Sequence, residues 1–285
     1  MPRSPYNELW RKRRTLLQRH FKIAACDIPT RDKIPVIQKL LDPNGAGLAL
    51  DIGSGIGYTT NSVLGDHPTV CVDLHAPNLL FYRSKIASLP AAVSPLCVVA
   101  RATALPFKST VFRFILCSEV LEHLDDDETC VQEIARLLKH DGRAVVTVPY
   151  TGFGFTSFLE FCGLRTVHDF PGPEHHVRPG YSEASLDALL ARHGLQLERH
   201  AYYLRLFTRL VTDVVSLAHL IYQRVLHRRR AWNWAEVASA EKTIAFRAYT
   251  FAFPILWAFS RLDRLLIRRR GFGLVAAVTK RKPQP

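Results

Sequence analysis

The sequence predicts an α/β protein with a doubly wound, mostly parallel sheet. Short apolar runs that suit buried strands alternate with helical segments over most of residues 47–203. The expected strands lie at 48–50, 67–73, 96–100, 111–117, 143–148 and 195–203, and the expected helices at 59–64, 77–86, 127–139 and 181–193. Ser182 is the expected N-cap of the last of these helices. Because helices separate successive strands, the strands are expected to run parallel, with helices on both faces of the sheet.

The turn after the first strand is the most informative stretch. Gly53, Gly55 and Gly57 follow Asp51 at alternate positions, so the backbone can bend sharply and approach a ligand without a Cβ in the way. In a dinucleotide fingerprint the third glycine comes three residues after the second, whereas Gly57 follows Gly55 by two. The spacing therefore indicates a nucleoside-like ligand without a pyrophosphate.

Composition sets limits on the class of protein. The chain has 285 residues, of which 48% are hydrophobic, and its mean hydropathy is near zero, which argues against both disorder and a polytopic membrane protein. Six cysteines without a Cys-x-x-Cys pair are expected to be free, mostly buried thiols in a reducing cytosol. No apolar run of a secretory signal follows Met1. A cytoplasmic location is therefore expected.

The net charge of +13 is unevenly distributed. Residues 1–20 carry six Lys and Arg against one acid, and residues 201–285 carry 16 against four. The middle of the chain, 21–200, carries 16 basic and 20 acidic residues. This pattern is typical of a soluble catalytic body that meets an anionic surface through its basic ends.

Polar residues follow each of the first four predicted strands. They are Asp51, Asp73, Arg101 to Thr103, and Ser118 with Glu119. In a doubly wound sheet the ligand lies beyond the carboxyl ends of the strands. Asp73 can accept both hydroxyls of a ribose, and Asp51 can attract a cationic group or hold the glycine turn.

Taken together, these residues resemble the class I S-adenosylmethionine-dependent methyltransferases, in particular their small-molecule branch, methyltransferase type 11. The resemblance rests on LDIGSGIG at 50–57, VD at 72–73, ATALPF at 102–107, SEVLEH at 118–123 and LLKHDG at 137–142, and it spans about residues 45–150. It implies a Rossmann-like sheet of seven strands whose last strand, at 271–280, is antiparallel. The expected divisions are an N-terminal helical extension at 1–42, a core at 43–205 and 271–281, and an inserted helical element at 206–270.

The family also implies roles for single residues. The cofactor S-adenosylmethionine would be held by Asp51, Gly53, Ser54, Gly55, Gly57, Asp73, Leu74, Arg101, Ala102, Ser118 and Glu119. Arg101 departs from the pattern, because the family usually has an acid there and a guanidinium cannot accept a hydrogen bond. A non-catalytic, cofactor-binding partner subunit is therefore an open alternative.

The acceptor is expected to be a small molecule, hydrophobic or lipid-linked. Alignment of the acceptor with the methyl group is the main requirement, and His123 and His176 are candidates for a general base, with a structural role equally open for each. No metal is expected, because the histidines lack zinc spacing. The run Asp125 to Asp127 is read as a helix start.

The inserted element combines apolar and basic residues. Helices are expected at 206–226 and 244–267, both interrupted by polar residues or proline, so that neither suits a membrane span. Apolar bulk beside arginine clusters predicts contact with an anionic membrane surface at the cytoplasmic face. A lid over the acceptor or a dimer face is the alternative, and the oligomeric state is open. RNA methylation is disfavoured, since the block after the fourth strand differs from that of base-amino methyltransferases.

Overall fold

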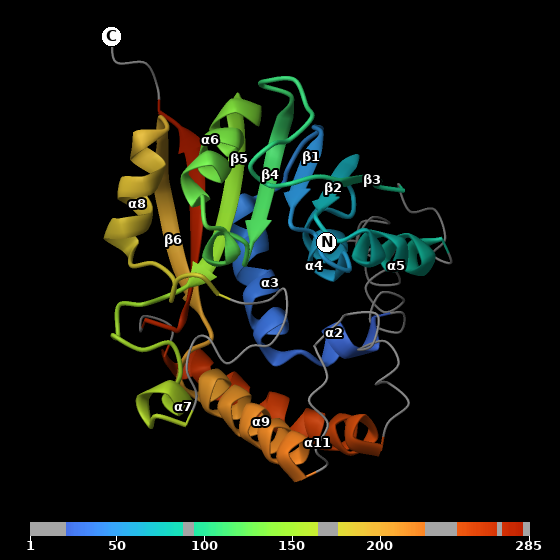
Figure 1. Ribbon diagram of the computed structural model, residues 1–285, viewed down its shortest axis with the longest axis vertical. Coiled ribbons are helices and arrows are strands. Elements are labelled where there is room, and N and C mark those ends of the chain that lie inside the picture. The colour runs from blue at the N-terminus through green and yellow to red at the C-terminus, as the bar shows by residue number, and fades with distance from the viewer. Residues whose placement is uncertain (1–20, 88–93, 165–175, 226–243, 267–269, 282–285) are drawn as a thin grey trace, which may run out of the picture.

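A computed structural model describes residues 21–87, 94–164, 176–225, 244–266 and 270–281 (Figure 1). Its described residues form a seven-stranded sheet in the order β3-β2-β1-β4-β5-β7-β6. The strands are β1 Ala49–Ile52, β2 Thr69–Asp73, β3 Leu96–Val99, β4 Phe112–Ser118, β5 Leu138–Pro149, β6 Leu195–Tyr203 and β7 Gly273–Lys280. The predicted fold class is confirmed, including a helical segment before the sheet.

Strand direction follows the predicted pattern. β1 pairs in parallel with β2 and β4, and β4 pairs in parallel with β5. β7 is antiparallel to both β5 and β6. The carboxyl ends of the parallel strands point to the end of the molecule where α2, α9 and α11 lie (Figure 1). β5 begins five residues earlier than the expected 143, because Leu138 pairs with Phe112 across an irregularity in the register.

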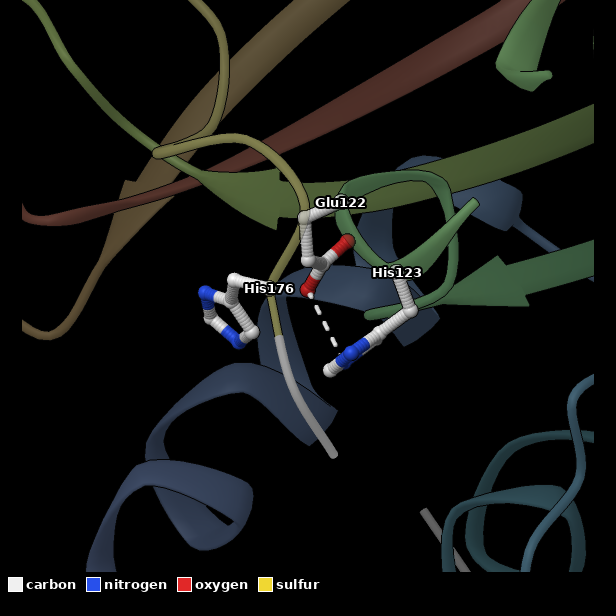
Figure 2. Close-up of side chains that lie close together, drawn as sticks. All are labelled: Glu122, His123 and His176. Atoms are coloured by element: carbon white, nitrogen blue, oxygen red, sulfur yellow. Dashed lines mark ion pairs between the residues drawn. The ribbon is translucent and has the colours of Figure 1, made fainter. Parts of the chain in front are cut away.

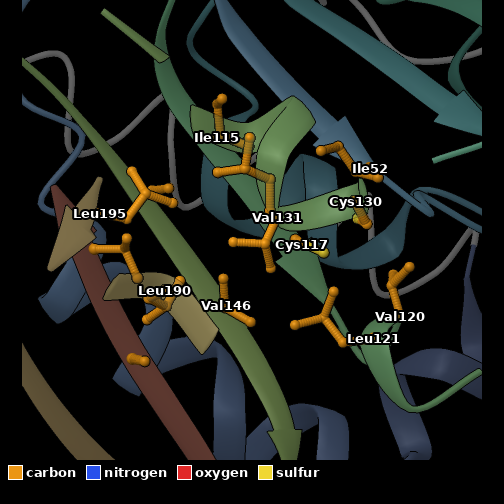
Figure 3. Close-up of a cluster of buried hydrophobic side chains, with 14 of the residues drawn as sticks. Ile52, Ile115, Cys117, Val120, Leu121, Cys130, Val131, Val146, Leu190 and Leu195 are labelled. Carbon is orange, nitrogen blue, oxygen red and sulfur yellow. The ribbon is translucent and has the colours of Figure 1, made fainter. Parts of the chain in front are cut away.

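Helices cover both faces of the sheet. On one face, α6 Asp127–Leu137 and α8 Glu183–Arg192 bury their apolar side chains against β1, β4, β5 and β7. Figure 3 shows part of this cluster, in which Ile115 and Cys117 of β4 meet Val131 of α6. Alternate residues of β4, Phe114 and Leu116, face the opposite layer. The strands are therefore buried on both sides, as their nearly continuous apolar runs predict.

The opposite layer is formed by α3 Ile28–Leu41, α4 Tyr58–Leu64 and α5 Ala76–Ile86. Ile37 and Leu41 of α3 pack on this face of the sheet. Phe21 and the short helix α2 Lys22–Cys26 pack against Tyr82 of α5. The helical part of the predicted N-terminal extension thus packs on the sheet, while its residues 1–20 lie outside the described residues.

Two long helices connect β6 to β7. α9 Leu206–Val225 and α11 Ile244–Ser260 lie side by side, and α11 continues into the 3₁₀ turn η2 Arg261–Leu266 (Figure 1). Pro254 lies inside α11 without ending it. Together with Ile28, the side chains of Val211 and Phe253 form a small separate core. Within the described parts of the chain, every helix is too short or too polar to cross a membrane.

Two short helices were not anticipated from the sequence, namely η1 Leu121–His123 and α7 Phe158–Phe161. The cysteines follow the expectation in part. None of the six forms a disulfide, but only Cys71, Cys117 and Cys130 are buried, and Cys162 is exposed. Cys162 lies directly after α7, a helix of one turn, which explains why its apolar sequence context did not lead to burial.

Ser182 caps α8 as predicted, since its hydroxyl accepts a hydrogen bond from the Ser185 backbone N–H at 3.1 Å. Replacement of Ser182 by Ala should lower the free energy of unfolding by about 1 kcal/mol, because that N–H loses its partner. Urea denaturation measures the loss. Ser84→Ala, an exposed serine within α5 that caps nothing, is the matched control and should stay within about 0.5 kcal/mol of the wild type. Equal effects of the two variants would contradict the capping role.

Candidate functional site

The glycine turn after β1 leaves an open space at its centre. Gly53, Gly55 and Gly57 all have positive φ angles, between 53° and 75°, which other residues rarely adopt. A Cβ on Gly53 would lie 2.4 Å from Val120, and a Cβ on Gly57 would lie 2.4 Å from the Tyr82 ring. A Cβ on Gly55, in contrast, would meet no atom within 4 Å. Gly53 and Gly57 are required for packing, whereas the backbone at Gly55 borders a space that a ligand can enter.

Asp73 closes the turn from the neighbouring strand. Its Oδ2 accepts a hydrogen bond from the Gly55 N–H at 2.8 Å. Its Oδ1 accepts one from the His75 N–H at 2.8 Å and one from the Asn78 amide at 3.2 Å. The carboxylate is therefore fixed beside the open space and oriented by three donors. Leu74, the next residue, is 54% exposed beside it.

Asp51 lies beneath the turn and is buried. Its Oδ2 accepts a hydrogen bond of 2.5 Å from the Thr60 hydroxyl. Burial, and to a smaller extent the negative charge of Asp73, raise the pKa of Asp51 to about 7. Ser54, also buried, has a hydroxyl oxygen without a hydrogen-bond partner among the described residues. Both groups are suited to a polar, cationic ligand that reaches the turn.

The block at 102–107 is held from α6. Arg136 donates to the backbone carbonyls of Leu105 and Phe107, at 3.0 and 2.6 Å. Glu133 pairs with Arg136 and accepts the Leu105 N–H at 2.8 Å. Arg101 is exposed and Ala102 half-buried at the start of this block. The ion pair of Glu133 and Arg136 thus holds the backbone of the loop at Leu105 and Phe107. The exposed Arg101 does not belong to this ion pair.

Ser118 and Glu119 belong to a network at the end of β4. The Thr147 hydroxyl donates to Glu119 Oε1 at 2.7 Å and lies 2.9 Å from the Ser118 hydroxyl. The Tyr203 hydroxyl donates to the same Glu119 oxygen at 2.8 Å. Burial raises the pKa of Glu119, but Lys33 and these hydroxyl donors outweigh it, so that the pKa lies below its ordinary value. Glu119 is therefore ionised, and its backbone has a positive φ of 56°, a strained conformation typical of functional sites.

The two histidines that the sequence singled out meet at the site. His123 of η1 and His176, from the segment before α8, have ring centroids 4.7 Å apart in an edge-to-face arrangement. Figure 2 shows both rings next to the Glu122 carboxylate, with Glu122 Oε1 at 4.0 Å from His123 Nε2. Burial, and next the negative charge of Glu119, raise the pKa of Glu122 well above its ordinary value. The structure thus brings together the two candidate bases, and it adds a buried acid that was not singled out.

The segment that carries His176 is anchored by its neighbours. Arg178 pairs with Asp127 and donates to the Leu124 carbonyl at 2.7 Å. The Tyr181 hydroxyl donates to the same Asp127 carboxylate at 2.6 Å. Asp126, the residue before Asp127, caps α6, since its side chain accepts a hydrogen bond from the Thr129 N–H. The acidic run at 125–127 is thus a helix start, as predicted, and Arg178 and Tyr181 order the loop that positions His176.

Several residues of the site had no sequence signal. Lys33 of α3 is buried, and its positive charge acts on Asp51, Glu119 and Glu122. Thr147 and Tyr203 come from β5 and β6. None of these lies in the blocks at 50–57, 72–73, 102–107 or 118–123, and each reaches the site only through the tertiary fold. A lysine on the apolar face of α3 is the one local signal that could have identified Lys33.

Comparison with known proteins agrees with this geometry. A family model described as a methyltransferase domain matches residues 50–146. The chain is similar to the ubiquinone biosynthesis O-methyltransferase of Xanthomonas axonopodis pv. citri, with 30% identity over 58% of this chain and 69% of that protein. It is 33% identical to the Xylella fastidiosa protein of the same name, over 58% of this chain and 67% of that protein.

Solved structures share the fold at low sequence identity. The geranyl diphosphate C-methyltransferase from Streptomyces coelicolor A3(2) superposes with a TM-score of 0.51 and 15% identity, over 87% of this chain and 78% of that one. The sheet order, the antiparallel β7 and the glycine turn define a protein of the methyltransferase fold. Together with the two relatives, they show that the chain belongs to the class I S-adenosylmethionine-dependent methyltransferases. It is an enzyme of that class, and S-adenosylmethionine is the cofactor of the class.

The raised pKa of Asp51 predicts a pH-dependent stability. An unfolded aspartate ionises near pH 4, whereas folded Asp51 keeps its proton up to about pH 7. As the pH rises through this window, the unfolded state releases a proton that the folded state retains, so stability is lost. Asp51→Asn avoids this loss. Its free energy of unfolding, relative to the wild type, should be larger at pH 8 than at pH 4.5 by about 3 kcal/mol. Urea denaturation without ligand at both pH values measures it.

Asp187→Asn, at an exposed position of α8, is the control for that experiment. Its difference from the wild type should stay nearly constant between the two pH values. The same constancy for Asp51→Asn would contradict a raised pKa of Asp51.

Proposed function

We propose that this enzyme transfers the methyl group of S-adenosylmethionine to a small hydrophobic or lipid-linked acceptor while its helices α9 and α11 rest on an anionic membrane surface. The observation that carries the proposal is the open space at Gly55, where a Cβ would meet no atom within 4 Å, beside the Asp73 carboxylate that accepts the Gly55 N–H. The cofactor, when bound, supplies a methyl group activated by positively charged sulfur.

The residues around the turn fit the cofactor. Asp73 would hold the ribose hydroxyls, and the Asn78 amide, its longest hydrogen bond, is the partner that a second hydroxyl would replace. Leu74 would lie beside the adenine, with Arg101 and Ala102 at its edge. Gly53, Ser54, Gly55 and Gly57 would surround the methionine portion, with Asp51 near its amino group. Ser118 and Glu119 would lie beneath the sulfonium, where an ionised carboxylate favours positive charge.

The acceptor would lie beyond Glu119, next to His123 and His176. The chain's task in this reaction is to align the acceptor oxygen or carbon with the methyl group, because the leaving group is already activated. Loop ordering by Arg178 and Tyr181 keeps this side of the site in place. Both histidine rings are half-buried and could face the acceptor there.

Two further observations favour a hydrophobic acceptor. The first is that two relatives are named for ubiquinone biosynthesis and the structural neighbour from Streptomyces coelicolor is named for geranyl diphosphate. The second observation concerns the exposed side chains of α9 and α11, which we call the outer face. These helices lie near the carboxyl ends of the strands, the side on which an acceptor enters (Figure 1).

The outer face carries two apolar stripes. On α9, exposed apolar residues recur on one side of the helix, at Leu206, Leu210, Val214, Leu217 and Ile221. On α11 and η2, a second stripe consists of Phe251, Ile255, Phe259, Leu262 and Leu265, of which Phe251 is 86% exposed. Apolar patches of this kind mark contact surfaces. An amphipathic pair of helices can bury such stripes at the boundary of the lipid headgroups.

The charged residues of α9, α11 and η2 indicate what kind of surface these helices can contact. The acids in the described parts of α9, α11 and η2 are Asp213 and Asp263, and both are buried. Asp213 accepts the Phe158 N–H, and Asp263 accepts the N–H groups that begin α9. The charged residues exposed on α11 and η2 are Arg247, Arg261 and Arg264. Helices that expose arginines and bury their acids are complementary to anionic lipid headgroups.

Calorimetric titration with S-adenosylmethionine tests the cofactor site. Leu74→Ala should weaken binding by about tenfold, since the side chain would cover part of the adenine. Leu80→Ala, at a similarly exposed position of α5, should leave affinity unchanged. Asp73→Ala should weaken binding by about 30-fold or more, because hydrogen bonds to a charged group are lost. Absence of heat with the wild-type protein would refute the cofactor site.

Vesicle flotation tests the outer face. Phe251→Glu with Ile255→Glu should reduce binding to phosphatidylglycerol-containing vesicles by about tenfold or more, because apolar burial is lost and like charges repel. Both positions are exposed, so the variant should fold normally. Leu80→Glu is the control and should bind like the wild type. Equal binding by all three proteins, or tight RNA binding with a steep salt dependence but no vesicle binding, would overturn the membrane proposal.

A further inference from the structure

Five phenylalanines form a cluster between the sheet and the long helices. Four belong to the segment 151–164, which follows β5 and contains α7, and the fifth precedes β7; they are Phe153, Phe155, Phe158, Phe161 and Phe272. The ring centroid of Phe272 lies 5.0 Å from that of Phe153 and 5.3 Å from that of Phe158. The ring centroid of Phe155 lies 5.8 Å from that of Phe272 and 5.0 Å from that of Phe161. We call these five rings the phenylalanine cluster, and none of them belongs to the cofactor site or to the candidate bases.

The inner end of the phenylalanine cluster lies next to a residue of the site. Phe272 and Tyr203 are buried in the same apolar core. A Cβ on Gly273, the residue after Phe272, would lie 2.1 Å from the Tyr203 ring. The hydroxyl of that ring donates to Glu119 at 2.8 Å. A single aromatic side chain, Tyr203, thus connects Glu119 with the phenylalanine cluster.

The outer end of the phenylalanine cluster faces solvent. Phe161 is 70% exposed and Phe153 is 39% exposed, whereas Phe155 and Phe158 are half-buried. A Cβ on Gly154, which lies between Phe153 and Phe155 in the chain, would meet no atom within 4 Å. The cluster therefore extends from a buried ring beside the site to rings at the surface, with open space at the backbone next to them. An apolar ligand on these rings would remove their surface from water.

The charged groups near the phenylalanine cluster are bound to the protein itself. Glu160 is the charged residue of the segment 151–164, and its Oε2 accepts the Thr156 N–H at 2.7 Å and the Thr156 hydroxyl at 2.5 Å. On α9, Arg209 pairs with Asp213, whose carboxylate also accepts the Phe158 N–H at 2.9 Å. A ligand on the exposed rings thus meets apolar carbon. This environment favours a hydrocarbon over an ionic group.

We propose that the phenylalanine cluster binds the hydrocarbon chain of a lipid-linked acceptor whose reacting group lies beside Glu119. The inference rests on the proposed function, because it requires an acceptor that carries such a chain. Phenylalanine rings suit this role, since each offers a large apolar area and dominates the contacts it makes.

Continuity with the outer face identifies the chain as the occupant. α7 packs beside α9 (Figure 1), and Leu206 and Leu210 begin the exposed apolar stripe of α9. A chain on the phenylalanine cluster would therefore lead from the vicinity of Tyr203 toward the helices that we propose to contact the membrane. An acceptor anchored in lipid needs a path of this kind, because its reacting group must reach the cofactor while its chain stays away from water.

A series of linear alcohols tests the proposal, because an alcohol supplies a hydrocarbon chain without cofactor, methyl transfer or membrane. Calorimetric titration of the full-length protein with alcohols from butanol to decanol should show affinity that rises roughly twofold to fourfold with each added methylene. Phe161→Ser and Phe153→Ser should each weaken decanol binding by about fivefold or more, because apolar contact area is lost. Leu80→Ser, at an exposed position of α5, is the control and should bind decanol like the wild type.

Three outcomes would overturn the proposal. The first is no saturable decanol binding by a protein that unfolds cooperatively. The second is unchanged binding by the double variant Phe153→Ser, Phe161→Ser. The third is a loss of binding caused by Phe251→Ser instead, which would place the chain on α11.

Two measurements on the wild-type protein separate these results from a failure of the proposed function. Calorimetry with S-adenosylmethionine and vesicle flotation report on the cofactor site and the outer face, and neither requires a free hydrocarbon chain. Normal results in both, without decanol binding, would reject the hydrocarbon site alone. Decanol binding that depends on Phe153 and Phe161, without cofactor or vesicle binding, would support the hydrocarbon site and reject the proposed function.

Discussion

The structure depends on how a group of carboxylates is accommodated at one edge of the sheet. Asp51, Glu119 and Glu122 lie at or just beyond the carboxyl ends of β1 and β4, where the charge of Asp73 acts on Asp51 and that of Glu119 acts on Glu122. Lys33 is the buried lysine that opposes them within the described residues. Because burial penalises each negative charge, the three carboxylates do not all ionise with equal ease. Glu119 is ionised and hydrogen-bonded, whereas Asp51 and Glu122 have raised pKa values.

This arrangement explains why the N-terminal helices belong to the catalytic body. Lys33 comes from α3, whose apolar residues Ile37 and Leu41 pack on the sheet. The helix thus brings a positive charge to the site by the same contacts that cover the core. Asp32, its neighbour, accepts the Leu204 N–H at 2.7 Å and connects α3 to the end of β6. A methyltransferase core without this segment would leave the acidic edge open to water and without its buried cation.

Local features of this protein could be predicted well from the sequence. The glycine turn, the alternation of strands and helices along the chain and the Ser182 cap each follow from residue types at short spacing. The convergence of His123 with His176 could not, because it requires the anchoring of a distant segment by Arg178 and Tyr181. Lys33, Thr147 and Tyr203 were missed for the same reason. The early start of β5 arises from pairing with β4, which overrides the local preference of residues 138–142.

The short connection between β6 and α9 has a mechanical consequence. Tyr203 ends β6 with its hydroxyl on Glu119, Leu204 follows with a positive φ of 54°, and α9 begins at Leu206. The residue that forms the hydrogen bond to Glu119 and the first residue of α9 are therefore separated by only two residues, Leu204 and Arg205. Any displacement of the first turn of α9 would therefore have to be taken up within Leu204 and Arg205 if the hydrogen bond between Tyr203 and Glu119 is to keep its geometry.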